Sequence, residues 1–290
     1  MAERLGFIGL GIMGYPMAAH LLEHHPVTVY NRSVEKAKQL AAKGAQLAYS
    51  PRQVAEASEI IFVMVSDDHA LKSVMEGGDG VISAIGPDQI IVDHSTVSVS
   101  LTEILGATVA AKGARWCDAP VTGGDVGAKN ATLTIMVGAD PEIYRRIEPY
   151  LTLMGKLVLH VGPTGKGQAL KVVSNLVSAM NLMAAAEGIR LGLEAGLSLD
   201  ALEAVMTHGS AQSFEVTKIV DRVRRQDFNP GFSVANRLKD LDLALALADN
   251  LGFSAPLGAA AQSLFAAHKA LGFQSEDESS YVLRWPEFHD

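Results

Sequence analysis

A glycine-rich turn near the start of the chain could hold a pyrophosphate. An apolar strand pattern over Leu5–Ile8 leads into Gly9-Leu10-Gly11-Ile12-Met13-Gly14, and a helical pattern follows. Gly9 and Gly11 permit a tight turn and a close backbone approach to phosphates, while Gly14 lets the helix pack closely on the strand. The N-terminus of the helix adds free N–H groups and a positive dipole end. The spacing therefore predicts a dinucleotide site, the alternative being a tight turn with no ligand.

The residues after the second strand bear on the choice of cofactor. An NAD site usually carries an acid about 20 residues after the glycines, where it accepts a hydrogen bond from the ribose 2′-OH. This chain has Asn31-Arg32-Ser33 there. Arg32 can pair with a 2′-phosphate, and Asn31 and Ser33 can donate to the same group. We therefore expect NADP(H) to be preferred over NAD(H); if Arg32 is only a solvated loop charge, the choice stays open.

A proline- and glycine-rich segment could bind an anionic substrate group. Asp118-Ala119-Pro120-Val121-Thr122-Gly123-Gly124 follows a strand pattern and is expected to be a loop. The Thr122 hydroxyl and the N–H groups of Gly123 and Gly124 could together bind a carboxylate. A plain connection between two elements is the alternative.

A lysine lies on one face of a predicted helix with a glycine and an asparagine. Gly167, Lys171 and Asn175 are spaced by four residues, which places them on the same face. The glycine is expected to leave room beside the lysine for cofactor or substrate. The neighbours Leu170, Val172 and Val173 are apolar, which predicts a buried lysine rather than a solvated one. Desolvation would help such a lysine to give up its proton.

Four separated motifs resemble the β-hydroxyacid dehydrogenase family, which includes 3-hydroxyisobutyrate dehydrogenases, tartronate semialdehyde reductases and glyoxylate/succinic semialdehyde reductases. The resemblance covers nearly the whole chain. The motifs are the glycine turn, the 118–124 segment with Thr122 where serine is commoner, the lysine motif over 165–175, and Phe232 followed by Lys239-Asp240-Leu241-Asp242-Leu243-Ala244-Leu245.

The resemblance implies a role for several residues. Lys171 would be the general acid/base, and Asn175 would orient both substrate and lysine. Lys239 would reach the cofactor, Asp240 would line the substrate pocket and Phe232 would close it. A solvated helix face is the alternative for Lys239 and Asp240, and a core contact for Phe232.

Two further loops are expected to lie along the cofactor, because they follow parallel strands. Thr96, in Asp93-His94-Ser95-Thr96, matches a family contact beside the nicotinamide. His94 departs from the methionine or cysteine expected there and is interpreted as a local variation. Val65 and Ser66 would pass near the adenosine.

Composition excludes several classes of function. The net charge is -8, with no long run of Lys or Arg, which argues against binding to nucleic acid or anionic lipid. Cys117 is the single cysteine, so no intrachain disulfide can form, and a reducing, cytoplasmic location is expected. Neither a signal peptide nor a membrane-spanning segment is expected. The histidines lack the paired spacing of a metal site, so no metal is expected.

The order of elements predicts two domains. Residues 1–163 alternate short strands and helices, which indicates a Rossmann-type parallel α/β sheet. Residues 164–290 are expected to be all helical and to serve substrate binding and oligomerisation, with a long interdomain helix at about 166–195. Shorter helices are expected at about 199–208, 211–226, 235–251 and 256–271.

Together these features predict an NADP(H)-dependent oxidoreductase that interconverts a small 3-hydroxy acid and its semialdehyde. Its substrate would be a small carboxylated aldehyde or hydroxy acid, and a homodimer or homotetramer is expected. An imine reductase shares this fold but typically lacks the lysine, so Lys171 argues against that alternative. A non-catalytic dinucleotide-binding protein is the other alternative, because fold alone does not fix function.

Overall fold

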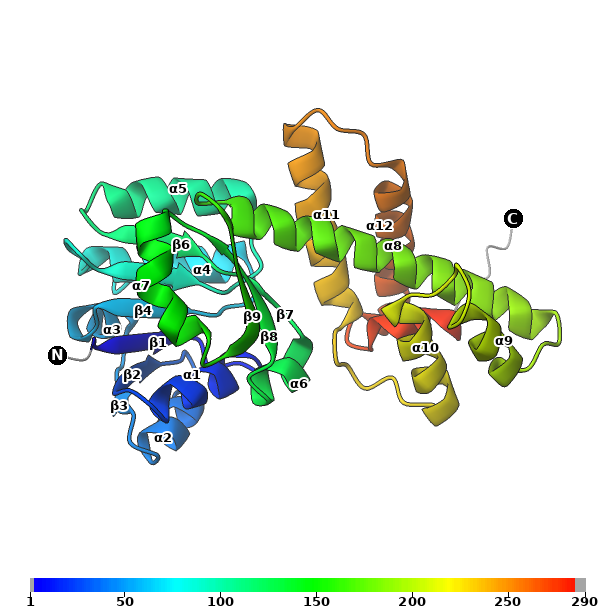
Figure 1. The fold of residues 1–290 in the computed structure, drawn as a ribbon, viewed down its shortest axis with the longest axis horizontal. Coiled ribbons are helices and arrows are strands. Elements are labelled where there is room, and N and C mark those ends of the chain that lie inside the picture. Colours follow the sequence, from blue (N-terminus) through cyan, green and yellow to red (C-terminus); the bar gives the residue numbers. More distant parts are fainter. Residues whose placement is uncertain (1–2, 285–290) are drawn as a thin grey trace. The chain divides into compact units, whose positions relative to one another are not determined.

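The computed structural model describes residues 3–284, and strands and helices alternate through the first half of the chain (Figure 1). Within these residues nine strands form one sheet. They are β1 Leu5–Ile8, β2 Val27–Tyr30, β3 Gln46–Leu47, β4 Ile60–Val63, β5 Ile90–Asp93, β6 Arg115–Asp118, β7 Val121–Thr122, β8 Leu133–Gly138 and β9 Gly155–Gly162.

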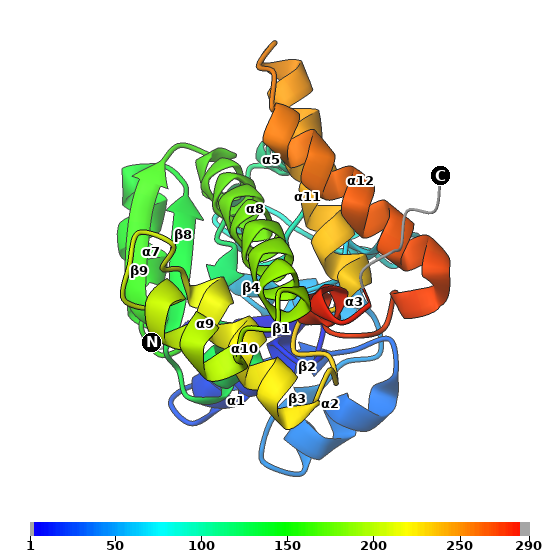
Figure 2. The same cartoon turned by 90° about the vertical axis from the view of Figure 1, so that its right-hand side faces the viewer.

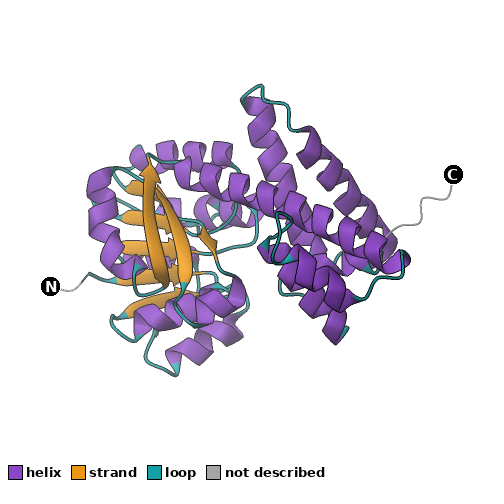
Figure 3. Ribbon diagram, turned by 45° about the vertical axis from the view of Figure 1, so that its right-hand side comes forward, coloured by secondary structure: helices purple, strands orange, loops and turns teal. Residues whose placement is uncertain are grey.

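Apolar residues on both faces of the inner strands β1, β4 and β5 explain why helices cover the sheet on both sides, as Figure 3 shows. Successive side chains of a strand point to opposite faces. In β4, Ile60 and Phe62 join one apolar cluster, whereas Ile61 and Val63 join another. The first cluster is covered by α1 Gly14–Leu22, α2 Val34–Ala41, α6 Gly124–Lys129 and α7 Pro141–Leu151. The second is covered by α3 Pro51–Ala57, α4 Asp68–Glu76 and α5 Val99–Ala110.

The sheet order is β3-β2-β1-β4-β5-β6-β8-β7, with β9 paired to β8. The six strands β3, β2, β1, β4, β5 and β6 are all parallel and follow the Rossmann order. From β1 the chain adds strands toward one edge as far as β3, and it then returns to place β4 on the other side of β1. The predicted Rossmann fold is therefore confirmed. At one edge the sheet also contains antiparallel pairs, because β8 runs antiparallel to β6 and β7.

The second half of the chain is helical, as predicted. The long helix α8 spans Lys166–Glu194, and four more helices follow it: α9 Leu199–Met206, α10 Phe214–Arg225, α11 Val234–Asn250 and α12 Pro256–His268. Ser198, Ser213 and Ser233 each accept a backbone N–H at a helix start. In Figure 2, α11 and α12 run alongside each other. The apolar core of this half joins side chains of α8, α10, α11 and α12 around Phe265 and Tyr281.

The chain divides into two compact units, 1–171 and 172–290, and α8 contributes to both. Among the described residues, α8 is also the one helix long and apolar enough to pass a composition test for a membrane span, although 44% of the tested window is buried. A core helix of a folded domain passes the same test. Length and composition alone therefore do not assign α8 to a membrane.

Candidate active site

The glycine turn has the geometry of a phosphate cradle. Gly9 has φ +94°, and a Cβ there would lie 2.1 Å from the Met64 carbonyl oxygen. A Cβ on Gly14 would lie 1.9 Å from the Gly9 oxygen, so both glycines are required by the protein's own packing. A Cβ on Gly11 would meet nothing within 4 Å, and both Gly11 and Ile12 are exposed. The turn thus closes tightly against β4 while its outer side stays open, which fits a pyrophosphate at the start of α1.

Of the three residues after β2, Asn31 is held by hydrogen bonds within the protein, whereas Arg32 and Ser33 are exposed. Asn31 accepts a hydrogen bond from the Leu10 N–H through Oδ1 at 2.8 Å and donates to the Ser33 carbonyl through Nδ2 at 2.8 Å. Asn31 therefore ties the glycine turn to the end of β2. Arg32 and Ser33 are exposed. The Asn31 Nδ2 group, which would donate to a 2′-phosphate, already donates to Ser33, so Arg32 and Ser33 are the better candidates for that group.

The loops after β4 and β5 are tied together at the same edge of the sheet. The Val65 N–H donates to Ser95 Oγ at 3.0 Å. The side chain of Ser66 donates to Asp67, so it is engaged locally. Thr96, which follows Ser95, is half-buried. Val65 and Thr96 thus lie on neighbouring loops beside the switch point, where this fold binds ligands.

His94 is buried in this region but is poorly suited to be a second base. Its ring stacks on Phe62 with a centroid distance of 5.8 Å, and Nδ1 lies 2.7 Å from the Ala119 carbonyl oxygen. Burial lowers the pKa of His94 to about 4, so the ring is neutral near pH 7. This agrees with its interpretation as a local variation.

The 118–124 segment is more ordered than the expected loop. Val121 and Thr122 form the short strand β7 against β8, and Gly123 immediately precedes α6 with φ +130°. Thr122, Gly123 and Gly124 are all exposed. The expectation of a simple loop is wrong, but the hydroxyl and the two glycine N–H groups remain accessible to a carboxylate.

The start of α8 is held by groups of the first unit. Asp118 accepts hydrogen bonds from the Gly165 and Gln168 N–H groups at 2.7 and 2.8 Å. The Gln168 side chain donates to the Ser95 carbonyl at 2.7 Å and accepts from the Val97 N–H at 3.3 Å. Lys171 follows three residues later and is buried, with 7% of its surface exposed. The helix segment before Lys171 is thus fixed to the carboxyl ends of β5 and β6.

Two expectations about this helix need correction. A Cβ on Gly167 would lie 2.4 Å from the Met136 carbonyl oxygen, so this glycine lets α8 approach β8 and does not leave room for a ligand. Of the three apolar neighbours of Lys171, only Val172 is buried, whereas Leu170 and Val173 are exposed by 38% and 49%. The burial of Lys171 therefore does not follow from a helix buried all round.

The second unit brings together Asn175, Asp240, Lys239 and Phe232. Asn175 Nδ2 donates to Asp240 Oδ2 at 2.5 Å, and Lys239 Nζ lies 3.1 Å from Asp240 Oδ1. Arg237, which was not predicted, donates to the Asn175 carbonyl at 3.1 Å and lies 4.9 Å from the centre of the half-buried Phe232 ring. Asp240 is buried, so its carboxylate is fixed by these partners.

The sequence did not predict three residues that hold the candidate site residues in place, namely Asp118, Gln168 and Arg237. Asp118 and Gln168 lie inside the 118–124 and 165–175 motifs, but the acid caps a helix start that lies 47 residues later in the chain, so no local signal indicates this role. Arg237 pairs with Glu278 across 41 residues, and no local signal in the sequence connects the two.

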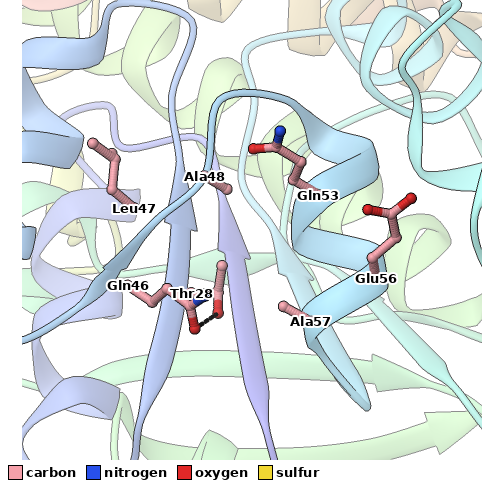
Figure 4. Close-up of a pocket in the computed structure, with 7 residues that line it drawn as sticks. All are labelled: Thr28, Gln46, Leu47, Ala48, Gln53, Glu56 and Ala57. Atoms are coloured by element: carbon pink, nitrogen blue, oxygen red, sulfur yellow. Dashed lines mark hydrogen bonds between the residues drawn. The ribbon is translucent and has the colours of Figure 1, made fainter.

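A surface pocket in the first unit, drawn in Figure 4, is separate from these groups. It is lined by residues of β2, β3, the loop after β3 and α3, which are Thr28, Gln46, Leu47, Ala48, Gln53, Glu56 and Ala57. None of them is a predicted site residue, and the one charged side chain is an acid, which disfavours an anionic ligand. Over residues 3–284 no group of three or more His, Cys, Asp or Glu could hold a metal ion.

Comparisons with known proteins cover both halves of the chain. Residues 4–162 match the family model described as the NAD binding domain of 6-phosphogluconate dehydrogenase, and residues 165–285 match that described as NAD-binding of NADP-dependent 3-hydroxyisobutyrate dehydrogenase. The chain is 38% identical to 2-(hydroxymethyl)glutarate dehydrogenase of Eubacterium barkeri, over 97% of this chain and 94% of that one. It is 37% identical to 2-hydroxy-3-oxopropionate reductase of Escherichia coli, over 96% of each.

One solved structure extends the agreement to three dimensions. Mycobacterium tuberculosis 3-hydroxyisobutyrate dehydrogenase with L-serine has a TM-score of 0.90 and 31% identity, over 98% of this chain and 99% of that one. The similarity thus runs through both the sheet and the helical half.

Proposed function

Because this chain belongs to the β-hydroxyacid dehydrogenase family, we propose that it reduces a short carboxylated semialdehyde to the 3-hydroxy acid with NADPH, using Lys171 as general acid. The chain is a hydroxyacid dehydrogenase with an NAD(P)-binding domain. The choice of NADPH, the catalytic lysine and the semialdehyde are the proposed parts. A semialdehyde is supported by the similarity to 2-hydroxy-3-oxopropionate reductase.

The burial of Lys171 is the observation that carries this proposal. Lys171 is only 7% exposed, and burying a lysine ammonium carries a desolvation cost that a role in the site would explain. Lys171 stands directly after the helix segment that Asp118 and Gln168 fix at the carboxyl ends of β5 and β6. In open α/β sheets that edge is where ligands bind.

The residues of the chain would divide the chemistry as follows. Bound NADPH supplies a hydride from C4 of its nicotinamide to the carbonyl carbon of the substrate. The Lys171 ammonium donates its proton to the carbonyl oxygen, so that the alcohol forms without a free alkoxide; in the reverse direction the neutral amine accepts the hydroxyl proton. Thr122 and the N–H groups of Gly123 and Gly124 bind the carboxylate, and the Asn175–Asp240 pair presents further polar groups to the substrate.

The preference for NADPH rests on the end of β2. No carboxylate stands there to accept from a 2′-OH or to repel a 2′-phosphate. Arg32 is exposed and free of any ion pair among the described residues, so it can turn toward the phosphate. The similarity of residues 165–285 to an NADP-dependent enzyme supports the same choice.

The test follows the loss of nicotinamide absorbance with NADPH or NADH and with glyoxylate and with succinic, methylmalonic and tartronic semialdehydes. Wild type is compared with Lys171→Met, which keeps the length of the side chain and removes the proton. Turnover with NADPH that collapses in the variant supports the proposal. A cyclic imine is included, because turnover of the imine alone would favour an imine reductase.

We also propose a homodimer or homotetramer in a reducing, cytoplasmic setting. Large apolar side chains of the helical half are exposed, with Val205 at 72% and Phe214 at 81%, and such surfaces favour association. Light scattering of wild type and Phe214→Ser would test the subunit number.

A further inference from the structure

We propose that Asp118 and Gln168 form a clamp that positions Lys171 for proton transfer. The inference rests on the proposed role of Lys171 as general acid. Neither clamp residue handles a proton of the substrate; both act through the helix that carries the lysine. All the groups involved lie within residues 1–171, the first compact unit.

Asp118 is the first half of the clamp. Its two carboxylate oxygens accept from two N–H groups at the start of α8, Oδ1 from Gly165 and Oδ2 from Gln168. These N–H groups have no partner inside the helix, because the first turn of any helix leaves its N–H groups free. A buried carboxylate from β6 therefore replaces the local cap residue that most helices use. The start of α8 is thereby fixed to the sheet.

Gln168 is the second half of the clamp. Whereas Asp118 reaches from the sheet to the helix, the Gln168 side chain reaches from the helix to the loop after β5. Its backbone is held by Asp118, while its side chain donates to the Ser95 carbonyl at 2.7 Å and accepts from the Val97 N–H at 3.3 Å. The side chain is fully buried, and both bonds go to backbone groups on either side of Thr96. One residue thus connects α8, β6 and the loop predicted to lie beside the nicotinamide.

The clamp acts on Lys171 because a helix transmits position along its axis. Gln168 and Lys171 are three residues apart and share a helix face. Gly167 lies between the two residues whose N–H groups Asp118 binds, and a Cβ there would lie 2.4 Å from the Met136 carbonyl oxygen, so α8 packs directly against β8 at this point. A displacement of about 1 Å at a catalytic group costs up to about a hundredfold in rate.

Gln89 provides a matched control for Gln168. It also bridges separate loops through its amide, accepting from the Gly86 N–H and donating to the Ala55 and Ser58 carbonyls at 2.7, 2.7 and 2.6 Å. It stands immediately before β5 and touches no predicted site residue. Gln89→Leu and Gln168→Leu therefore remove similar hydrogen bonds at opposite ends of the same strand.

The experiment measures kcat, KM for NADPH and the primary isotope effect with deuterated NADPH, together with amide hydrogen exchange. We expect Gln168→Leu to lower kcat by about 10- to 100-fold, to change KM for NADPH by less than about threefold and to raise the isotope effect. Exchange should accelerate at residues 94–99 and 163–172. Gln89→Leu should lose comparable thermal stability and keep kcat within about twofold of wild type.

Asp118→Asn tests the other half while keeping the volume of the side chain. In this variant one of the two acceptor oxygens is replaced by an NH2 group that faces a backbone N–H. We therefore expect kcat to fall and amide exchange at residues 163–172 to accelerate. Asp118→Ala should lower kcat further and accelerate the exchange further. Equal loss of kcat in Gln168→Leu and Gln89→Leu, or unchanged exchange over 163–172, overturns the clamp. A Lys171→Met variant that keeps wild-type kcat overturns the proposed function instead, so the two failures are distinguishable.

Discussion

Asn175 Nδ2 lies 2.5 Å from Asp240 Oδ2, which joins α8 to α11 by a hydrogen bond between two side chains. Asp240 is buried, so this bond fixes a charge that water does not solvate. Both residues were predicted to face the substrate, and the structure shows that they are a unit.

A double-mutant cycle should reveal that unit. We expect Asn175→Ala and Asp240→Ala each to lower kcat/KM by at least tenfold, and the double variant to lose less than the product of the two. The coupling should be on the order of 1–3 kcal/mol, as for hydrogen bonds to charged groups. Strictly multiplicative losses would show that the pair does not act together.

Arg237 should be the strongest single stabiliser of the helical unit. Its guanidinium donates to Ser178 Oγ and to both oxygens of Glu278, and Arg237 and Glu278 are 5% and 1% exposed. Removing one partner leaves a buried charge, so Arg237→Met should lower the free energy of unfolding by about 3–5 kcal/mol.

Urea unfolding followed by circular dichroism measures this loss. Arg225→Met is the control, because that side chain is 70% exposed and its one ion pair within residues 3–284 is with Asp221. It should cost no more than about 1 kcal/mol. Similar losses in both variants would contradict the importance of the buried pair.

Substitutions at two glycines of the turn should affect cofactor binding and protein stability separately. Gly11→Ala adds a methyl group to open space, so we expect wild-type stability and a rise of at least tenfold in the Kd for NADPH. Gly14→Ala adds one that would lie 1.9 Å from the Gly9 oxygen, so it should lower the melting temperature. Calorimetry and fluorescence titration measure the two effects. Normal NADPH binding by Gly11→Ala would place the phosphates elsewhere.

Arg32 should distinguish the two cofactors. Arg32→Ala is expected to raise the KM for NADPH about tenfold or more and to leave that for NADH within about threefold, because only NADPH carries the 2′-phosphate. Steady-state kinetics with both cofactors measures the change, and Arg225→Ala controls for a lost surface charge. Equal effects on both cofactors would remove the argument for an NADP preference.

Asp93 should make the fold less stable at neutral than at acid pH. Burial raises the pKa of this carboxyl from 3.8 to about 7, and its Oδ2 has no hydrogen-bond partner among the described residues. The native state therefore binds more protons than the unfolded state between these pKa values, and the stabilisation is lost as pH rises toward 7. Asp93→Asn should raise the free energy of unfolding at pH 8 by roughly 1–3 kcal/mol and have little effect at pH 4.

Urea midpoints at the two pH values measure this difference. A variant that is equally destabilised at both values would show that the carboxylate is needed in its charged form.

Strand and helix patterns were sufficient to predict the fold because local periodicity carries it. The continuous apolar run from Ile60 to Val63 and the proline-free run from Lys166 to Glu194 are visible in the sequence. The antiparallel pairing of β8 was not predictable, since direction depends on which distant strand accepts it. The short strands β3 and β7 have too few residues to show a period.

Site residues could be predicted where a short sequence motif contains them. Contacts between residues far apart in the sequence could not. Gly167 was assigned to ligand space, but its close neighbour is Met136, 31 positions earlier in the chain. Asp118 and Gln168 act on residues 47 to 73 positions away. Such bonds depend on the folded arrangement, which spacing alone does not contain.

Single-turnover kinetics of Lys171→Met tests the central claim most directly. With saturating NADPH and the best semialdehyde, we predict an unchanged Kd for NADPH and a hydride-transfer rate lowered by about 10²- to 10⁴-fold, the usual contribution of a general acid. A hydride-transfer rate within about threefold of wild type, with binding intact, would contradict the assignment of Lys171 as the proton donor.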